Sequence, residues 1–491
     1  MKKTLFILLL LVACFTGNAQ ELSFADPLGS HMVIQQNKPF KVWGKAKPNA
    51  KVTVFADWLQ SPVEVKADDA GSFLAIVSVP EIAKGDFTEH QLIIESNGEK
   101  QSLTDILIGE VWICSGQSNM QFGMDEVINS AEEVSKANFP NIRLFYAGLN
   151  FSNEPIENVD GEWKVCNTES VYKFSAVGYY FGKELFEELN VPVGIVFTGI
   201  GASAAQAYVP KAVLAADDLL NDKYLQPYLR SSKSKEVIDG GFSFEKVIMP
   251  FLLYNALIHP FKNLSISGFC WYQGESNRNE RTAYTHLMHT MISSWREAFA
   301  QGDLPFYFVQ IAPYFYDIED PKRAEFAFFR EAQEKISSVA NTEMVVTMDV
   351  GNAIDLHPKN KKPIGIRLGK TALNRHYGLQ NISYEGPIFD SVDFNGAKAL
   401  LSFKPSSVKS GLKTNDGQPP KFFQLAGEDQ IFYEAEAKIV SNKIQLSSSE
   451  VSKPVAVRYA FTNYPVTNLE NGEGIPAVPF RTDDWQEPPV K

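Results

Sequence analysis

The sequence predicts an α/β domain with a mostly parallel sheet, placed between two smaller β-domains of sandwich type. Its 491 residues exceed one ordinary hydrophobic core, so two or three domains are expected. In the middle of the chain, apolar runs alternate with segments of helical periodicity, which favours parallel strands with helices on both faces. Towards both ends, short β-rich runs separated by turn residues replace this alternation.

The first residues are typical of an export signal. Two lysines follow Met1, an apolar stretch covers residues 5–13, and small residues come next. The stretch is too short for a permanent membrane span. Two processing sites compete, namely cleavage after Ala19, which we favour, and a lipoprotein box that would leave Cys14 lipidated. We therefore take residues 1–19 as a signal peptide and expect a periplasmic or extracellular protein.

Residues 20–105 are expected to form a small β-sandwich domain. Three short runs there are rich in β-branched and aromatic residues, with Gly, Pro and Asn between them. These runs are residues 40–44, 51–56 and 91–95. The same pattern returns at residues 389–491, with runs at 398–403 and 443–447, so a second β-domain is expected there.

Residues 106–388 are the predicted α/β domain. Five apolar runs predict its strands, at residues 106–114, 193–198, 266–272, 305–311 and 344–349. Helical periodicity is clear at 176–189 and 284–298. The segment 211–244 is polar and irregular, which indicates an insertion near a cleft.

Composition and charge exclude two classes of function. The chain is 44% hydrophobic and 21% charged, as soluble globular proteins are, and its net charge is −12. It has no cluster of Lys and Arg, and an acidic surface repels phosphate backbones, so nucleic-acid binding is not expected. No second apolar run is long enough for an integral membrane span. The sequence indicates no particular oligomeric state.

A serine turn follows the first strand of the α/β domain. Ser118 lies in the block Ser-Gly-Gln-Ser-Asn-Met at residues 115–120. A serine on a glycine-bearing turn at a strand end can present its hydroxyl to a cleft, with backbone N–H groups around it. Met120 stands where the elbow of α/β-hydrolases has its second glycine, so the turn is of another type. Ser118 is therefore a candidate nucleophile.

Two later strand ends supply possible partners for Ser118. One leads into the block Gln-Gly-Glu at residues 273–275, and the other into a loop that carries Asp355 and His357. Side chains two residues apart on extended backbone point to the same side. The carboxylate can then orient the imidazole while the other ring nitrogen reaches the serine. Asp349, at the strand end, is the alternative orienting carboxylate.

These blocks resemble the sialate O-acetylesterase family of the SGNH-hydrolase superfamily, over nearly the whole chain after the leader. Further matching segments are residues 31–36, 42–44, 174–181, 253–256, 258–260, 454–460 and 479–483. The resemblance implies an SGNH-hydrolase-like catalytic domain that removes O-acetyl groups from a carbohydrate substrate. It implies no metal and no organic cofactor.

The resemblance also implies an oxyanion hole, which needs donors aimed at the developing negative oxygen. The donors would be the backbone N–H of Ser118, a glycine loop centred on Gly201, and the side chain of Gln273. The family's Gly-Gly-Thr is Gly-Ala-Ser in this chain, and its following Glu and Trp are Gln206 and Tyr208. This departure bears on substrate preference more than on catalysis.

Other polar residues near these blocks are given structural roles. Asn119 and Glu275 are expected to support the site by hydrogen bonding, which for Glu275 is favoured over a second catalytic acid. His286 and His289 lie three apart on a helix, but no carboxylate or cysteine pattern completes a metal site. His259, in an apolar stretch, is expected to be a core histidine with satisfied hydrogen bonds.

Three cysteines remain after the leader. Cys114 and Cys270 lie in apolar strands and Cys166 lies outside any polar turn, so buried free thiols are expected. The alternative is one disulfide among the three, which an oxidising compartment would allow. A catalytic cysteine is not expected.

The sequence leaves the identity of the sugar open. O-acetylated sialic acids are the first expectation, and acetylated plant-type polysaccharides such as xylan are the alternative. A competing class is a non-catalytic carbohydrate-binding protein with aromatic platforms, with which the 12% aromatic content is compatible. Such a protein would be expected to lack a member of the Ser-His-Asp set, and this chain has all three.

Overall fold

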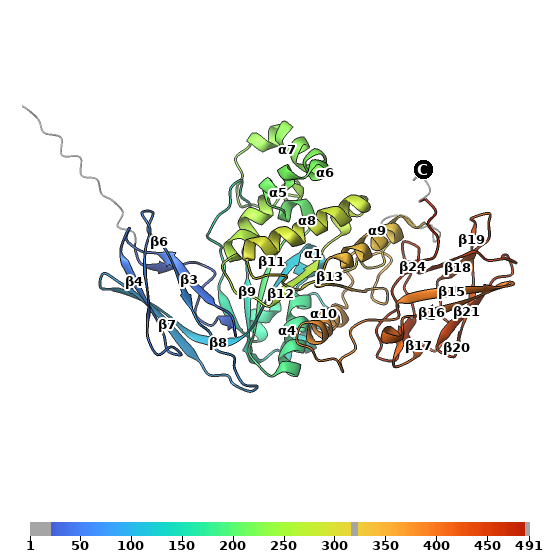
Figure 1. Cartoon of the computed structure of the whole chain (residues 1–491), viewed down its shortest axis with the longest axis horizontal. Coiled ribbons are helices and arrows are strands. Elements are labelled where there is room, and N and C mark those ends of the chain that lie inside the picture. The colour runs from blue at the N-terminus through green and yellow to red at the C-terminus, as the bar shows by residue number, and fades with distance from the viewer. Residues whose placement is uncertain (1–20, 316–322, 487–491) are drawn as a thin grey trace, which may run out of the picture.

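The computed structural model describes residues 21–315 and 323–486. Along the long axis of the molecule, an N-terminal β region, a central α/β region and a C-terminal β region follow one another (Figure 1). This arrangement confirms the predicted α/β class with strands at both ends. The predicted signal peptide and Cys14 lie outside the described residues, so export stays a prediction.

The central sheet has the strand order β10-β9-β11-β8-β12-β13-β14. Its strands are β8 (Glu99–Gly116), β9 (Phe139–Tyr146), β10 (Trp163–Cys166), β11 (Val193–Gly199), β12 (Gly268–Tyr272), β13 (Phe306–Val309) and β14 (Thr342–Val345). Six of them run parallel, and β10 is antiparallel to its neighbour β9. Strands β11 and β9 lie on one side of β8, and strands β12, β13 and β14 lie on the other. The direction in which successive strands are added to the sheet therefore reverses at β8.

Both faces of the sheet are buried, as its continuous apolar runs require. From β8, Val111 and Ile113 enter the core beneath α8 (Thr282–Phe299) and α9 (Glu325–Glu334). Trp112 and Cys114 enter the opposite core, beneath α4 (Ala176–Leu189) and α10 (Lys362–Arg375). Figure 1 shows these two helix pairs on opposite faces.

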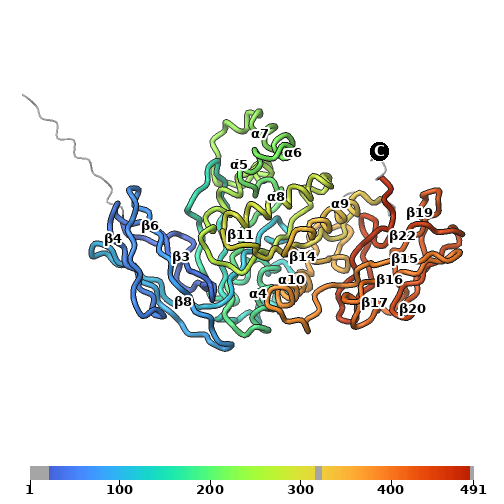
Figure 2. The backbone as a smooth tube through the Cα atoms, viewed as in Figure 1, coloured from blue at the N-terminus to red at the C-terminus, as the bar shows by residue number. Residues whose placement is uncertain are grey.

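Two predicted elements differ in the structure. The strand expected at 344–349 ends at Val345, because Thr347 bonds its hydroxyl to the Gln310 carbonyl at 3.1 Å and the chain turns. The segment 211–244 is largely helical, with α5 (Lys211–Ala216), α6 (Asp218–Leu220) and α7 (Gln226–Arg230). Leu214, Leu220 and Leu225 of this segment are buried, and the tube in Figure 2 shows these helices standing out from the central region.

The N-terminal region consists of two small groups of strands. One is a sheet of β1 (Ser23–Phe24), β3 (Phe40–Lys45) and β6 (Ser72–Val77). The other contains β4 (Lys51–Ala56), β5 (Val63–Lys66) and β7 (His90–Ser96), and β7 pairs with the first half of β8. The short β2 (Val33–Gln35) pairs with the middle of β8. The strand β8 thus passes without interruption through the domain limit proposed at residues 105–106.

The C-terminal region contains two four-stranded antiparallel sheets and a strand pair. The first sheet has β15 (Phe389–Asn395), β16 (Lys398–Phe403), β20 (Glu436–Val440) and β21 (Lys443–Ser447). The second has β18 (Phe423–Ala426), β19 (Phe432–Glu434), β22 (Ala456–Tyr459) and β24 (Phe480–Arg481), and the pair is β17 (Leu412–Thr414) with β23 (Leu469–Asn471). One apolar core joins the sheets, and Arg481 binds Glu331 of α9, which ties this region to the central one.

Cys114, Cys166 and Cys270 are buried and free, as predicted. Cys114 and Cys270 lie side by side on β8 and β12. Burial raises the pKa of the Cys166 thiol to about 12 and that of Cys270 well above its usual value, so neither is a reactive thiolate. Among the helices of the described residues, none has both the length and the apolar character that crossing a membrane requires.

Candidate active site

Three strand ends meet at the carboxyl edge of the central sheet. Gly116 at the end of β8 pairs with Gly199 at the end of β11 and with Tyr272 at the end of β12. The segments that follow these residues therefore leave the sheet side by side. Because the strand order reverses at β8, this edge is where open α/β sheets form ligand crevices.

The turn after β8 requires glycine at position 116. Gly116 has a φ of 142°, and a Cβ there would lie 2.2 Å from the Tyr272 carbonyl oxygen. The turn leads directly into α1 (Ser118–Gln121), whose first residue, Ser118, is half-buried. At the first position of a helix the backbone N–H has no partner within the helix. Ser118 therefore offers both its hydroxyl and its N–H at the strand end.

His357 lies against Ser118. Its Nε2 is 2.7 Å from the Ser118 Oγ, which is hydrogen-bond distance. The ring stacks on Phe122 with centroids 6.3 Å apart and an interplanar angle of 27°. Burial lowers the pKa of His357, and the Lys361 ammonium lowers it further, against the opposite effect of Asp355. The neutral imidazole that can accept a proton from the serine is thereby favoured.

Of the two candidate aspartates, the structure brings only Asp355 to His357. Asp355 Oδ1 accepts the backbone N–H of His357 at 2.8 Å and lies 4.0 Å from the ring Nδ1. Asp349 instead forms a two-fold ion pair with Arg367 of α10, at 2.8 and 2.6 Å. The side chains of Asp349 and Arg367 are both largely buried, so the Asp349 carboxylate has a structural role in this ion pair.

Gln273 does not have the geometry expected of an oxyanion donor. Its amide is fully buried, and Nε2 donates to Asn277 Oδ1 at 2.7 Å and to the Ser203 carbonyl at 3.2 Å. Its Oε1 accepts the Tyr284 hydroxyl at 3.0 Å. Both amide hydrogens are used, as is usual for buried amides, so neither is aimed at Ser118. The expectation that the Gln273 side chain is an oxyanion donor therefore needs correction, because its amide is used to hold neighbouring residues in the floor of the site.

Gly201 lies beside Ser118 but already has a partner. A Cβ on Gly201 would be 3.5 Å from the Ser118 Cβ. The backbone N–H of Gly201 donates to Gln121 Oε1 at 2.8 Å. The Gln121 amide in turn donates to the Tyr146 hydroxyl at 2.9 Å. The next residue, Ala202, has a φ of 61°, in the left-handed region that favours glycine. This accounts for the glycine expected there from the family pattern.

A buried polar cluster lies behind Ser118, and one of its members, Lys361, was not predicted from the sequence. Asn119 is fully buried, and its amide donates to Glu275 Oε1 at 2.7 Å and accepts from Lys361 Nζ at 2.5 Å. Asn119 therefore links Glu275 and Lys361 by hydrogen bonds. Lys361 was missed because it belongs to a run with Lys359 and Lys362 that is typical of an exposed surface.

The other histidines singled out in the sequence are paired with polar side chains. His286 binds Asp217 at 2.6 Å and His289 lies 3.4 Å from the Ser338 hydroxyl, both at the surface. His259 is half-buried and binds Glu157, so its hydrogen bonding is satisfied although it is not in the core. Within residues 21–315 and 323–486, no group of three or more His, Cys, Asp or Glu could hold a metal ion.

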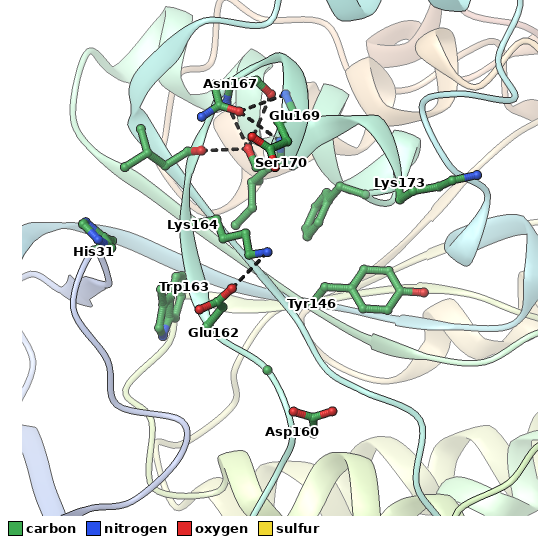
Figure 3. A pocket seen from close by; sticks show the side chains of 14 residues that line it. His31, Tyr146, Asp160, Glu162, Trp163, Lys164, Asn167, Glu169, Ser170 and Lys173 are labelled. Atoms are coloured by element: carbon green, nitrogen blue, oxygen red, sulfur yellow. Dashed lines mark hydrogen bonds and ion pairs between the residues drawn. The ribbon is translucent and has the colours of Figure 1, made fainter.

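A polar groove adjoins the serine turn. A cavity of about 300 Å³ is lined by Gln121, Glu126, Tyr146 and Lys173. Tyr146 and Lys173 also line a second cavity of about 810 Å³, which extends over β10 towards Trp163. Figure 3 shows charged and amide side chains around this second cavity, with Tyr146 on one side and the β10 residues on the other. Such a lining offers hydrogen-bond donors and acceptors to a ligand rich in hydroxyls.

Comparisons with known proteins identify the family. Residues 108–374, more than half of the chain, match the model of the family described as carbohydrate esterase, sialic acid-specific acetylesterase. Sialate O-acetylesterase of Mus musculus is 26% identical, over 96% of this chain and 97% of its own, and that of Homo sapiens is 27% identical over 77% and 76%.

A solved structure agrees with this result over nearly the full length. The carbohydrate acetylesterase XAC1771 from Xanthomonas citri superposes with a TM-score of 0.83 at 32% identity, covering 94% of this chain and 100% of that one. The non-catalytic carbohydrate-binding class is therefore set aside. The chain belongs to the family of carbohydrate esterases described as sialic acid-specific acetylesterases, and it is a carboxylic ester hydrolase that deacetylates sugars.

Proposed function

We propose that the chain is an exported serine esterase of the SGNH-hydrolase type, with Ser118 as nucleophile and O-acetylated sialic acid as its first substrate. The observation that carries the proposal is the 2.7 Å contact between Ser118 Oγ and His357 Nε2 at the carboxyl edge of the sheet. A nucleophile and a base within hydrogen-bond distance are the signature of covalent acyl transfer.

The reaction follows from this pair. His357 Nε2 takes the Ser118 hydroxyl proton as Oγ attacks the acetyl carbonyl carbon. The tetrahedral intermediate collapses when the protonated His357 gives that proton to the sugar oxygen, so the sugar leaves and an acetyl-serine remains. Water then attacks the acetyl group while His357 accepts its proton, and the proton returns to Ser118 Oγ as acetate departs. No step needs a metal or an organic cofactor.

Asp355 is proposed as the residue that orients His357. Its Oδ1 is 4.0 Å from the ring Nδ1, and catalytic hydrogen bonds are often long until substrate is bound. A carboxylate at Nδ1 selects the tautomer whose Nε2 can accept the serine proton, and it stabilises the imidazolium that forms. The commitment of Asp349 to Arg367 supports the choice of Asp355.

The proposed oxyanion hole has the Ser118 backbone N–H as its first donor. The Gly201 N–H is the second, and it would exchange the Gln121 oxygen for the substrate oxygen. Gln273 is assigned to the floor beneath this hole, because it holds Ser203 and Asn277 in place. Donors fixed before the reaction stabilise the developing charge without having to reorganise.

The domain limits and the location stay proposals. We take residues 1–19 as a signal peptide for export to the periplasm or the cell exterior, with lipidation at Cys14 as the alternative. The N-terminal β-domain would cover 20–105, the catalytic domain 106–388 and the C-terminal β-domain 389–491. Mass spectrometry of the mature N-terminus tests the cleavage site directly.

Acetate release from a matched panel tests the substrate. The panel contains O-acetylated sialosides and acetylated xylan, and the purified mature chain is compared with its Ser118→Ala variant on each. Preferential release from the sialosides, lost in the variant, supports the proposal. Preferential release from xylan would replace sialic acid with the hemicellulose alternative, and release that persists in the variant would contradict the assignment of Ser118.

A further inference from the structure

Lys361 is a fully buried lysine that contacts a neighbour of each member of the Ser118–His357 pair. It directly precedes α10, and its Nζ donates to Asn119 Oδ1 at 2.5 Å. The same Nζ lies 4.7 Å from the centre of the Phe122 ring, on which the His357 imidazole stacks. Lys361 therefore reaches the residue after Ser118 and the ring that supports His357.

The Asn119 amide joins three chain segments. Its Nδ2 donates to Glu275 Oε1 at 2.7 Å and to the carbonyl of Leu356, the residue before His357, at 3.3 Å. Its oxygen faces the Lys361 ammonium. A flipped amide would place its NH₂ against that cation and its oxygen against a carboxylate, so Lys361 and Glu275 together fix one orientation.

We propose that Lys361 is a positioning residue of the esterase: through Asn119 it holds the Ser118 turn against the His357 loop. The inference rests on the proposed Ser118–His357 pair. It adds a residue that no sequence block suggested, and Lys361 does not itself touch the reacting atoms.

Stability alone does not explain a lysine at this position. Removing an ammonium from water is costly unless the charge is paired and hydrogen-bonded, whereas an apolar side chain of similar length would fill the space without that cost. Lys361 has no direct ion pair in the described structure and reaches Glu275 only through Asn119. A group that is costly to bury and is placed behind a reacting pair is typical of functional sites.

The charges around Lys361 define the expected pH behaviour. Glu275, Asp355 and Glu126 face it from three segments and raise its pKa, but burial has the larger effect and lowers the pKa to about 7. Lys361 in turn lowers the pKa of His357. Catalysis needs neutral His357, so a protonated Lys361 extends activity to lower pH. Removal of the ammonium should move the acidic limb of the pH profile to higher pH.

The test compares Lys361→Met with Lys362→Met, a neighbouring lysine whose side chain is exposed and binds Glu133. Both purified variants are assayed with 4-nitrophenyl acetate across pH, and thermal unfolding checks that they fold. For Lys361→Met we expect kcat to fall about 10- to 100-fold with KM nearly unchanged, as misplacement of a catalytic pair does. Its acidic limb should lie at higher pH than that of the wild type. Lys362→Met should match the wild type in both respects.

A second variant, Lys361→Gln, separates position from charge and serves if Lys361→Met does not fold. It can keep a donor towards Asn119 but carries no charge, so it should recover part of kcat while the acidic limb stays displaced. Wild-type kcat and an unmoved acidic limb in either folded variant would overturn the inference. That result, with Ser118→Ala inactive, would leave the proposed function intact.

Discussion

The two sides of Ser118 are built differently. On one side, His357 and Asp355 stand on a loop, and each side chain is more than a third exposed. On the other side, Gln273 is fully buried in a closed set of amide and hydroxyl contacts. The loop side holds groups that must exchange protons with substrate and water, and the buried side holds groups that must not move. Variants on the loop side should therefore change catalysis, and variants on the buried side should change stability.

The largest effect is expected from Ser118→Ala, which removes the group between the two sides. Acetyl-ester turnover should fall by about 10⁴-fold or more, because both steps of the proposed mechanism pass through Oγ. The unfolding temperature should stay near that of the wild type, because a half-buried turn hydroxyl contributes little to stability. Steady-state rates and calorimetry measure the two effects, and activity above a few per cent would contradict the assignment.

The second prediction compares two aspartates under identical conditions. Asp355→Asn should leave the fold intact and lower kcat near neutral pH by up to about 10⁴-fold, since an amide favours the wrong imidazole tautomer. Asp349→Asn should cost stability instead, because Arg367 loses its partner within a largely buried ion pair. If Asp349→Asn proves the more damaging to kcat, the orienting role passes to Asp349. If neither variant changes kcat, the site is a Ser–His dyad.

The third prediction concerns the buried side. Gln273→Ala removes one hydrogen bond each from Asn277, Tyr284 and the Ser203 carbonyl. Asn277 keeps the Ala205 N–H and Tyr284 keeps the Gln273 carbonyl, but the Ser203 carbonyl loses its amide donor, and an unsatisfied buried polar group costs about 1–3 kcal/mol. We expect a clearly lower unfolding temperature, with any loss of kcat following from a disturbed floor. An unchanged unfolding temperature together with a kcat lower by about 10²- to 10³-fold would restore Gln273 as an oxyanion donor.

The sequence predicted the residues that local pattern defines. Ser118 and His357 lie in blocks at strand ends, and strand ends of a parallel sheet converge whatever their separation in the chain. The preference for Asp355 over Asp349 also followed from a local feature, the two-residue spacing to His357. On the scale of the fold, five of the seven strands along the central sheet were recognisable, because a strand buried on both faces is largely apolar, whereas β9 and β10 were not predicted.

What the sequence did not predict depends on tertiary partners. Of the three partners of the Gln273 amide, only Asn277 lies near it in the chain, whereas Ser203 and Tyr284 come from other elements. Likewise, Lys361 differs from Lys362 only in the direction in which the start of α10 places it, towards the sheet rather than the solvent. Burial of a polar residue is therefore the feature that local pattern reveals least.

The smallest effect is expected in the loop beside the serine, where Ala202 has a φ of 61°. The left-handed conformation costs a residue with a Cβ about 1–2 kcal/mol, a cost that glycine does not have. Glycine, however, loses more conformational entropy on folding. Ala202→Gly should therefore be neutral or stabilising by up to about 1 kcal/mol, measured by chemical denaturation. Ala204→Gly is the matched control, because Ala204 has an ordinary φ of −102° and should lose stability as glycine. Equal destabilisation by both substitutions would mean that Ala202 is not strained, and the departure from the family's glycine would then need another explanation.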